Sequence, residues 1–289
     1  MKMLSFIHNY PIISFFILTV VLGTSLIFLI FQGVIPAELA LSSVLSVSIS
    51  GVVITAILEG KTGLKLLFKR VLIWRVGIGY WIFAVFFLVP VILLGSLINP
   101  FFNGNPVSLN QLKLQLSIVP MYIIFFIVAG LGQELGWTGF LLPRLHTRFS
   151  ALLSGLIRAT FVIVWHIPLL IFTHAQPYVI QYFPYGAWIL QKGFWITFLA
   201  MALLSLPWSI LFTWLFNNTK GSLLLVAVFH GSEIWLVYLI SGMGIDPKNL
   251  DNLWGYGIVM ILSVITIIIL TGPENLSRRY KRIAYPELK

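Results

Sequence analysis

Long apolar runs separated by short polar connections dominate the chain. A membrane span needs roughly 20 apolar residues, and the connections, such as NNTKGS at 217–222, are rich in turn-forming residues. We therefore predict an all-α fold, a polytopic transmembrane helical bundle of about eight spans. No long linker or obvious repeat divides the chain, so we expect a single transmembrane domain over residues 1–289. The predicted spans are about 11–31, 35–58, 78–98, 115–143, 151–172, 194–216, 221–240 and 253–271.

Composition supports a membrane location. Of the 289 residues, 59% are hydrophobic and 9% charged, whereas soluble domains carry about 25% charged residues. The absence of cysteine excludes disulfides, thiolate metal sites and cysteine nucleophiles. The first apolar run is too long for a signal peptide and lacks a small-residue cleavage site, so we expect it to be retained as a span.

The basic residues predict the orientation. They cluster beside apolar runs, a pattern typical of membrane topology and lipid contact and not of nucleic-acid binding. With both termini cytoplasmic, the cytoplasmic side holds 14 of the 18 Lys and Arg residues, and the outer side holds only Lys113, Lys192 and Lys248. The basic, amphipathic segment 64–77 is predicted to lie along the inner interface, with an ordinary short cytoplasmic loop as the alternative.

Few ionisable groups fall inside the predicted spans, and such groups usually mark function or a compensating partner. Counted from the cytoplasmic turns, three of them lie about 10 to 16 residues deep on three different helices, which at about 1.5 Å per residue places them at similar depth. Lipid can satisfy none of them, so we predict a buried polar site. The three are Glu134, His166 and His230, and the remaining two intramembrane groups are Arg158 and Glu233.

The helix around Glu134 is rich in glycine. Gly132 and Gly136 have the GxxxG spacing that lets a neighbouring helix backbone approach closely, and Gly130 and Gly139 flank them. Helix packing alone accounts for these glycines but not for the acid among them. His230 and Glu233 are three residues apart and thus share a helix face, where the carboxylate can orient the imidazole.

Three segments resemble the CPBP family of intramembrane proteases. They are GLGQELGWTGFLLPRL (130–145), VWHIPLLIF (164–172) and VAVFHGSEIW (226–235), and LLFKRVLIWRVGIGYW (66–81) is similar to the family as well. The family comprises CAAX-type prenyl endopeptidases and bacteriocin-processing or self-immunity proteins. The resemblance implies a protease core at 110–240 (spans four to seven), a membrane-associated peptide or protein substrate, and a multi-pass location in the plasma membrane of a bacterium.

The resemblance also implies roles for particular residues. The family's first motif is Glu-Glu-x-x-x-Arg, its second ends in histidine, and its third is His-x-x-x-Asn. The first glutamate and the second-motif histidine are thought to activate water, while the third-motif histidine and asparagine stabilise the oxyanion. On this chain the second glutamate is Glu134, and the two histidines are His166 and His230. These three residues are our candidate catalytic groups.

Three motif positions depart from the family. Gln133 replaces the first glutamate, Thr138 the arginine and Ile234 the asparagine. Glutamine cannot accept a proton from water, and general-base assistance is worth about 10²–10⁴ in rate. Isoleucine cannot donate to an oxyanion, at a cost of around 10²–10³. These substitutions predict a weakened or inactive protease.

Two hypotheses would restore a working site. In the first, Glu233 replaces the missing carboxylate from the third motif. In the second, Arg158 supplies the cation that Thr138 does not. A divalent metal such as zinc, held by Glu134, His166 and His230, is a further alternative.

Three functions follow from these residues. The first is an intramembrane endopeptidase that uses water activated by glutamate and histidine. The second is a catalytically impaired relative that acts as a peptide-binding, bacteriocin-immunity or scaffold protein. The third, a proton-coupled transporter, is the weakest, because the sequence shows neither paired broken helices nor an inverted repeat.

Overall fold

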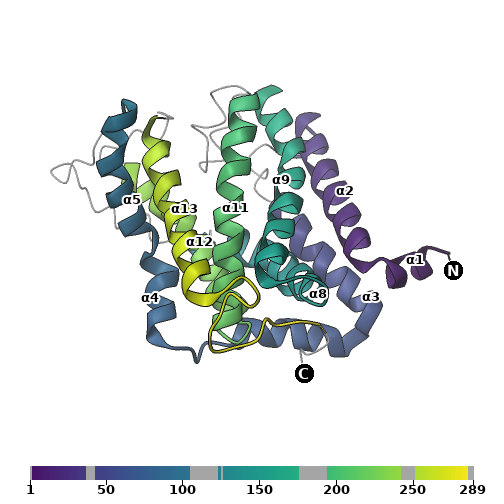
Figure 1. Ribbon diagram of the computed structural model, residues 1–289. Helices are drawn as coiled ribbons and strands as arrows, with labels where there is room; N and C mark the ends of the chain where they lie inside the picture. Colours follow the sequence, from purple (N-terminus) through teal and green to yellow (C-terminus); the bar gives the residue numbers. More distant parts are fainter. Residues whose placement is uncertain are drawn as a thin grey trace.

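The helices of the protein stand side by side as a bundle (Figure 1). The computed structural model describes residues 2–36, 43–104, 123–124, 126–175, 194–241 and 251–285 and contains no strand within them. The all-α prediction is therefore confirmed. The main helices are α1 (Lys2–Asn9), α2 (Pro11–Phe31), α3 (Leu45–Lys69), α4 (Ile78–Phe86), α5 (Leu88–Ile98), α9 (Ala151–Ala175), α11 (Phe194–Asn218), α12 (Leu223–Ser241) and α13 (Asp251–Thr271).

Five helical segments in the described part of the chain are long and apolar enough to cross a membrane. A sixth span results if α4 and the following Leu88–Phe102, bent by 45° relative to each other, are counted as one. The outer surface of the bundle is apolar, as lipid contact requires: Phe28 is 57% and Ile269 74% exposed. The protein is thus a polytopic membrane protein. The count of eight spans stays a prediction, because part of the fourth predicted span and Lys113, Lys192 and Lys248 lie outside the described residues.

Helix α3 is broken at Gly60, which has φ 59° and ψ −149°. Only glycine adopts this backbone conformation readily. Beyond the break the helix turns and runs along the lower edge of the bundle (Figure 1). This second half carries Lys61, Lys65 and Lys69 and ends in the short 3₁₀ turn η2 (Arg70–Leu72). The predicted interfacial segment is therefore helical up to residue 72 and lies across the other helices.

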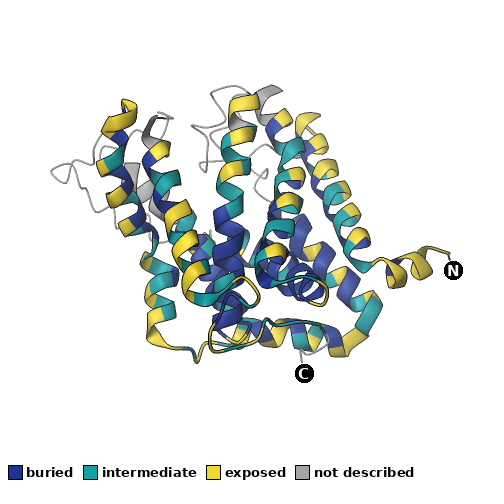
Figure 2. Ribbon diagram, viewed as in Figure 1, coloured by how far each residue is buried: buried dark blue, intermediate teal, exposed yellow. Residues whose placement is uncertain are grey.

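The segment 126–145 forms one wall of the interior. It consists of the π-helical stretch η6 (Phe126–Leu131), a short α-helical turn α7 (Gly132–Glu134), a second π-helical stretch η7 (Leu135–Leu141) and α8 (Leu142–Leu145). A side chain at Gly130 would collide with the Ala227 carbonyl of α12, and one at Gly136 with the Val47 carbonyl of α3. The predicted close approach of neighbouring backbones therefore occurs on both sides of Glu134, in the deeply buried centre of the bundle (Figure 2).

The C-terminal segment 272–285 folds back onto one end of the bundle. The Asn217 and Asn218 side-chain amides, at the end of α11, donate to the carbonyls of Asn275 and Leu276 at 2.9 and 2.8 Å. The amide of Ala151 donates to Glu274 O at 2.8 Å and so satisfies a free N–H at the start of α9. The turns at 146–150 and 217–222 and the tail thus share one end, as the predicted topology requires.

Candidate active site

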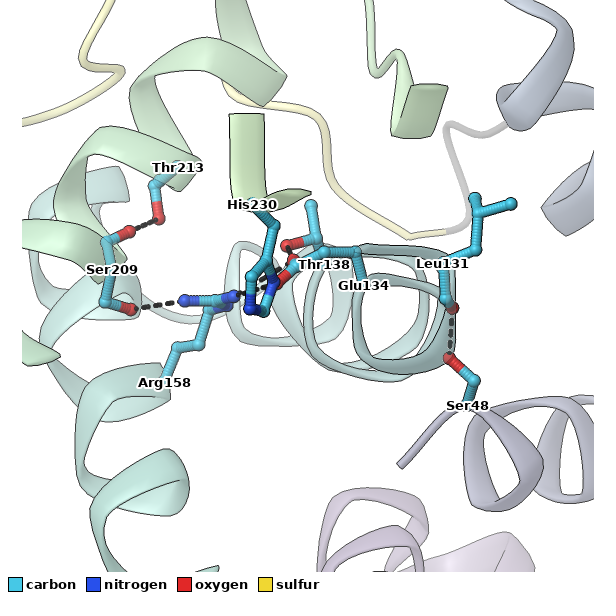
Figure 3. A network of polar contacts seen from close by, with 8 residues as sticks. All are labelled: Ser48, Leu131, Glu134, Thr138, Arg158, Ser209, Thr213 and His230. Carbon is cyan, nitrogen blue, oxygen red and sulfur yellow. Dashed lines mark hydrogen bonds and ion pairs between the residues drawn. The ribbon is translucent and has the colours of Figure 1, made fainter. Parts of the chain in front are cut away.

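Glu134 is fully buried between the two π-helical stretches η6 and η7. A π-helical stretch displaces carbonyls from the regular α-helical bonding pattern, and such stretches are frequent at functional sites. Here the Ser48 hydroxyl of α3 donates to the Leu131 carbonyl at 2.7 Å, which satisfies the irregular backbone inside the bundle. Figure 3 shows this contact at the right of the view, on the side of the helix away from the cluster around the Glu134 carboxylate.

Arg158 of α9 neutralises the Glu134 carboxylate. Its Nη2 donates to Oε1 at 2.9 Å and to Oε2 at 3.0 Å. Only 3% of the Arg158 side chain and none of the Glu134 side chain is exposed, so neither charge is compensated by solvent. Removing one partner of a buried pair typically costs about 3–5 kcal/mol, because the other charge is left alone. The guanidinium of Arg158 therefore reaches Glu134, as the hypothesis that Arg158 supplies the missing cation requires.

His230 of α12 contacts the same carboxylate: its Nδ1 lies 2.8 Å from Glu134 Oε1. Because the carboxylate beside a guanidinium is ionised and can only accept, we assign the proton to Nδ1. A neutral imidazole with a proton on Nδ1 has a lone pair on Nε2. The side chain of His230 is 14% exposed, so the described residues do not enclose it completely.

Thr138 donates its hydroxyl to Glu134 Oε2. It lies one helical turn after Glu134, at the position where the family motif has an arginine. The hydroxyl therefore takes the place that a guanidinium from the same helix would occupy, while the positive charge comes from α9 instead. Glu134 thus accepts from three donors on three segments of the chain, which Figure 3 shows converging.

His166 is not bonded to this carboxylate. Its Nδ1 bonds the Val162 carbonyl one turn earlier at 2.8 Å, and its ring packs against the edge of Trp165 with centroids 4.7 Å apart. A carbonyl only accepts, so Nδ1 of His166 carries the proton, and Nε2 has no hydrogen bond to any residue that the structure describes. The two histidines are close enough to interact electrostatically. Of the three predicted groups, Glu134 and His230 are thus in direct contact, and His166 interacts with His230 electrostatically.

Comparison with known proteins shows similarity to proteases. Residues 115–235 match the family described as "Type II CAAX prenyl endopeptidase Rce1-like". The chain is also 26% identical over 151 residues to the CAAX prenyl protease 2 of Methanococcus maripaludis. Over residues 115–235 the chain is thus similar to the CPBP family of intramembrane proteases. The alignment with that relative covers 51% of this chain and 52% of the relative, so the chain spans about half the length of the curated relative that it matches.

Of the departures from the CPBP motifs, Thr138 contacts Glu134 and Gln133 precedes it in the chain. Gln133 is 8% exposed, and its amide has no hydrogen bond to the residues that the structure describes. Glu233 interacts electrostatically with Glu134 and with Tyr256 of α13. The side chain of Ile234 lies outside the described residues.

The predicted metal ligands do not fit a metal ion. Within the described ranges, no group of three or more His, Asp or Glu side chains is arranged to hold one. Both oxygens of Glu134 are occupied by Arg158, His230 and Thr138, and a cation at that carboxylate would meet the guanidinium charge.

Two residues of α11 that contact the site were not predicted. Ser209 accepts a hydrogen bond from Arg158 Nη1 at 3.0 Å, and the Phe212 ring lies 4.8 Å from Arg158 Cζ. A serine and a phenylalanine inside an apolar span carry no sequence signal. The charge of Arg158 was the only available clue, since a buried cation needs polar neighbours.

Proposed function

We propose that this protein is an intramembrane endopeptidase whose working pair is Glu134 and His230, within a protease core at residues 110–240. The observation that carries the proposal is the 2.8 Å contact between His230 Nδ1 and a carboxylate that Arg158 keeps ionised. A carboxylate behind an imidazole fixes its tautomer and stabilises the imidazolium that forms when Nε2 takes up a proton. The match of residues 115–235 to a protease family supports the same reaction.

The residues assign a sequence of proton movements. His230 Nε2 accepts a proton from water as the water oxygen bonds to the scissile carbonyl carbon. The same proton then passes to the leaving amine as the C–N bond breaks, so water is divided between the two products. His166 Nε2 accepts from the second hydrogen of that water and orients it. His230 is the base because it has an ionised carboxylate at Nδ1, whereas His166 has only the neutral Val162 carbonyl.

The substrate class to test first follows from the relative's name, CAAX prenyl protease 2. We propose a membrane-associated peptide or protein, with a prenylated CAAX peptide as the first probe. The protein would be reconstituted in vesicles with a fluorescence-quenched farnesylated CAAX peptide and with the same peptide lacking the farnesyl group. This comparison separates prenyl recognition from peptide hydrolysis.

We expect hydrolysis of the farnesylated peptide by the wild type and a loss of at least about 100-fold in Glu134→Ala and His230→Ala. His8→Ala is the matched control, because His8 bonds only to the Leu4 carbonyl of its own short helix and is exposed. Equal hydrolysis by all four proteins would overturn the proposal.

A catalytically impaired, peptide-binding relative is the second candidate. Gln133 and Ile234 favour it, because they replace a motif acid and a motif hydrogen-bond donor. In that case the wild type and His230→Ala would bind the fluorescent peptide with similar affinity and neither would cleave it. Fluorescence anisotropy of the peptide in the same vesicles distinguishes this outcome from catalysis.

A further inference from the structure

We propose that Ser209 and Phe212 of α11 are positioning residues that hold Arg158, and through it the Glu134–His230 pair, in working alignment. The inference rests on the proposed function for its effect on the reaction, but its geometry can be tested without any substrate. Nothing in the family motifs points to α11. The two residues touch the groups that hold the carboxylate and not the reacting atoms.

Arg158 depends on few partners. Nη2 is bonded to Glu134 and Nη1 to the Ser209 hydroxyl at 3.0 Å, while the buried Nε has no partner among the described residues. Ser209 is itself only 1% exposed, so water cannot readily take its place. Hydrogen bonds to charged groups are stronger than those between neutral groups. Ser209 thus holds Nη1, the terminal nitrogen of Arg158 that is not bonded to Glu134.

One aromatic ring touches both Arg158 and His230, two of the partners of Glu134. The Phe212 ring lies 4.8 Å from Arg158 Cζ and its centroid lies 5.3 Å from that of His230. The face of an aromatic ring attracts a guanidinium, and a ring that contacts both side chains sets the distance between them. Phe212 is 4% exposed and therefore has little room to move.

The local structure of α9 and α11 brings these groups together. A side chain at Gly155 would lie 3.1 Å from Thr213 Oγ1 and 3.5 Å from Ile210 Cα, so glycine lets α9 approach α11 closely there. Arg158 follows one helical turn later on the same face. Thr213 donates to the Ser209 carbonyl at 2.8 Å, and Figure 3 shows this contact in line with Ser209 and Arg158.

The α11 contacts matter because the cation comes from another helix. An arginine at position 138 would share a helix with Glu134 and be aligned by that helix. Arg158 must instead be aligned across a helix–helix interface, and Ser209 and Phe212 are the α11 side chains that contact it there. The role of Ser209 should therefore vanish if the cation is returned to position 138.

The first test reads the histidine ring directly. The protein would be labelled with ¹⁵N-histidine, reconstituted in nanodiscs, and the His230 signals assigned with His230→Ala. We expect Ser209→Ala and Phe212→Leu to shift and broaden the Nδ1 resonance of His230, while Ser209→Thr, which keeps the hydroxyl, retains the wild-type signal. Ser205→Ala is the matched control, since Ser205 lies one turn earlier on α11 and donates to its own helix at Met201 O, 2.7 Å away.

The second test measures hydrolysis of the farnesylated CAAX peptide. We expect Ser209→Ala to lower kcat about tenfold with KM unchanged, and to have no effect in the background Thr138→Arg/Arg158→Thr. An unchanged His230 resonance in Ser209→Ala, or an equal effect of Ser205→Ala, would overturn the positioning role. If Ser209→Ala fails to fold, Ser209→Cys, which is similar in size but a weak hydrogen-bonding partner, replaces it in both tests. A shifted resonance in a protein that cleaves nothing would refute the proposed function and leave the positioning role intact.

Discussion

At the scale of single residues, the centre of the molecule is a carboxylate kept charged inside an apolar bundle. Glu134 is fully buried, and burial of an uncompensated charge is costly. Arg158, His230 and Thr138 each direct a donor at it. Because all its donors come from side chains, the carboxylate links α9 and α12 to the helix that carries it. Loss of Arg158 should therefore impair both stability and reaction.

The variant Gln133→Glu tests the effect of the glutamine that replaces the first-motif glutamate next to Glu134. The substitution restores a carboxylate where the family's first motif has its water-activating glutamate. We expect faster hydrolysis of the farnesylated CAAX peptide, by about 100-fold, with Gln133→Met as the control that removes the amide without adding a base. If Gln133→Glu hydrolyses the peptide no faster than the wild type, a carboxylate at position 133 does not act as a general base in this protein.

Sequence reasoning reached some of these residues and not others, for a physical reason. Charges inside an apolar span must find partners, so the sequence alone could nominate Arg158 as the cation of the site. Ser209 and Phe212 are ordinary residues of an apolar helix and become recognisable only when α9 and α11 are placed together. The hydrogen-bond partner of His166, its own helix backbone at Val162, was equally hidden.

At the scale of elements, close backbone contacts hold the π-helical wall. The Cβ of an alanine at position 136 would collide with the Val47 carbonyl of α3. We expect Gly136→Ala to lower the free energy of unfolding by about 1–3 kcal/mol, measured by thermal unfolding in detergent. Gly257→Ala is the control, since a Cβ there meets nothing within 4 Å. Equal melting temperatures for the two variants would contradict the packing described.

The docked tail should respond to pH through His146. Burial, with the nearby Arg282 charge, lowers the pKa of His146 to about 4, although its hydrogen bond to Ile283 O opposes this. The folded state thus keeps the ring neutral, while the unfolded state protonates near 6.5. The stability of the contact between residues 272–285 and the bundle should be constant above pH 6.5. It should decrease as the pH falls from 6.5 to about 4.

Hydrogen exchange of residues 272–285, corrected for intrinsic rates, measures this dependence. His146→Gln removes the titrating group, so its protection should be flat over the same pH range. Protection in the wild type that stays constant down to pH 4 would show that His146 does not couple the tail to proton binding.

The elements themselves were partly predictable. Apolar length predicted α2, α9, α11 and α13 to within a few residues of their observed ends. The π-helical stretches were not predictable, because they depend on partners such as Ser48 that come from another helix. The tail docking was missed for the same reason, since only the folded bundle places Asn217 and Asn218 beside it.

At the scale of the whole molecule, the absence of cysteine makes the topology directly measurable. Single cysteines at 148, 220, 113 and 248 would be probed with a membrane-impermeant maleimide in intact cells and in inverted vesicles. We expect Arg148→Cys and Lys220→Cys to be labelled only in inverted vesicles, and Lys113→Cys and Lys248→Cys only in intact cells. Labelling of positions 148 and 220 from opposite sides would contradict the shared end of the bundle.

The central claim is that the cation for Glu134 has moved from the first motif to α9 while the site still works. The most direct measurement is hydrolysis of the farnesylated CAAX peptide by the wild type, Arg158→Thr and Thr138→Arg/Arg158→Thr in matched vesicles. We predict activity in the wild type, a loss of at least about 100-fold in Arg158→Thr, and recovery in the double variant. A fully active Arg158→Thr, or a wild type that cleaves nothing, would contradict the claim.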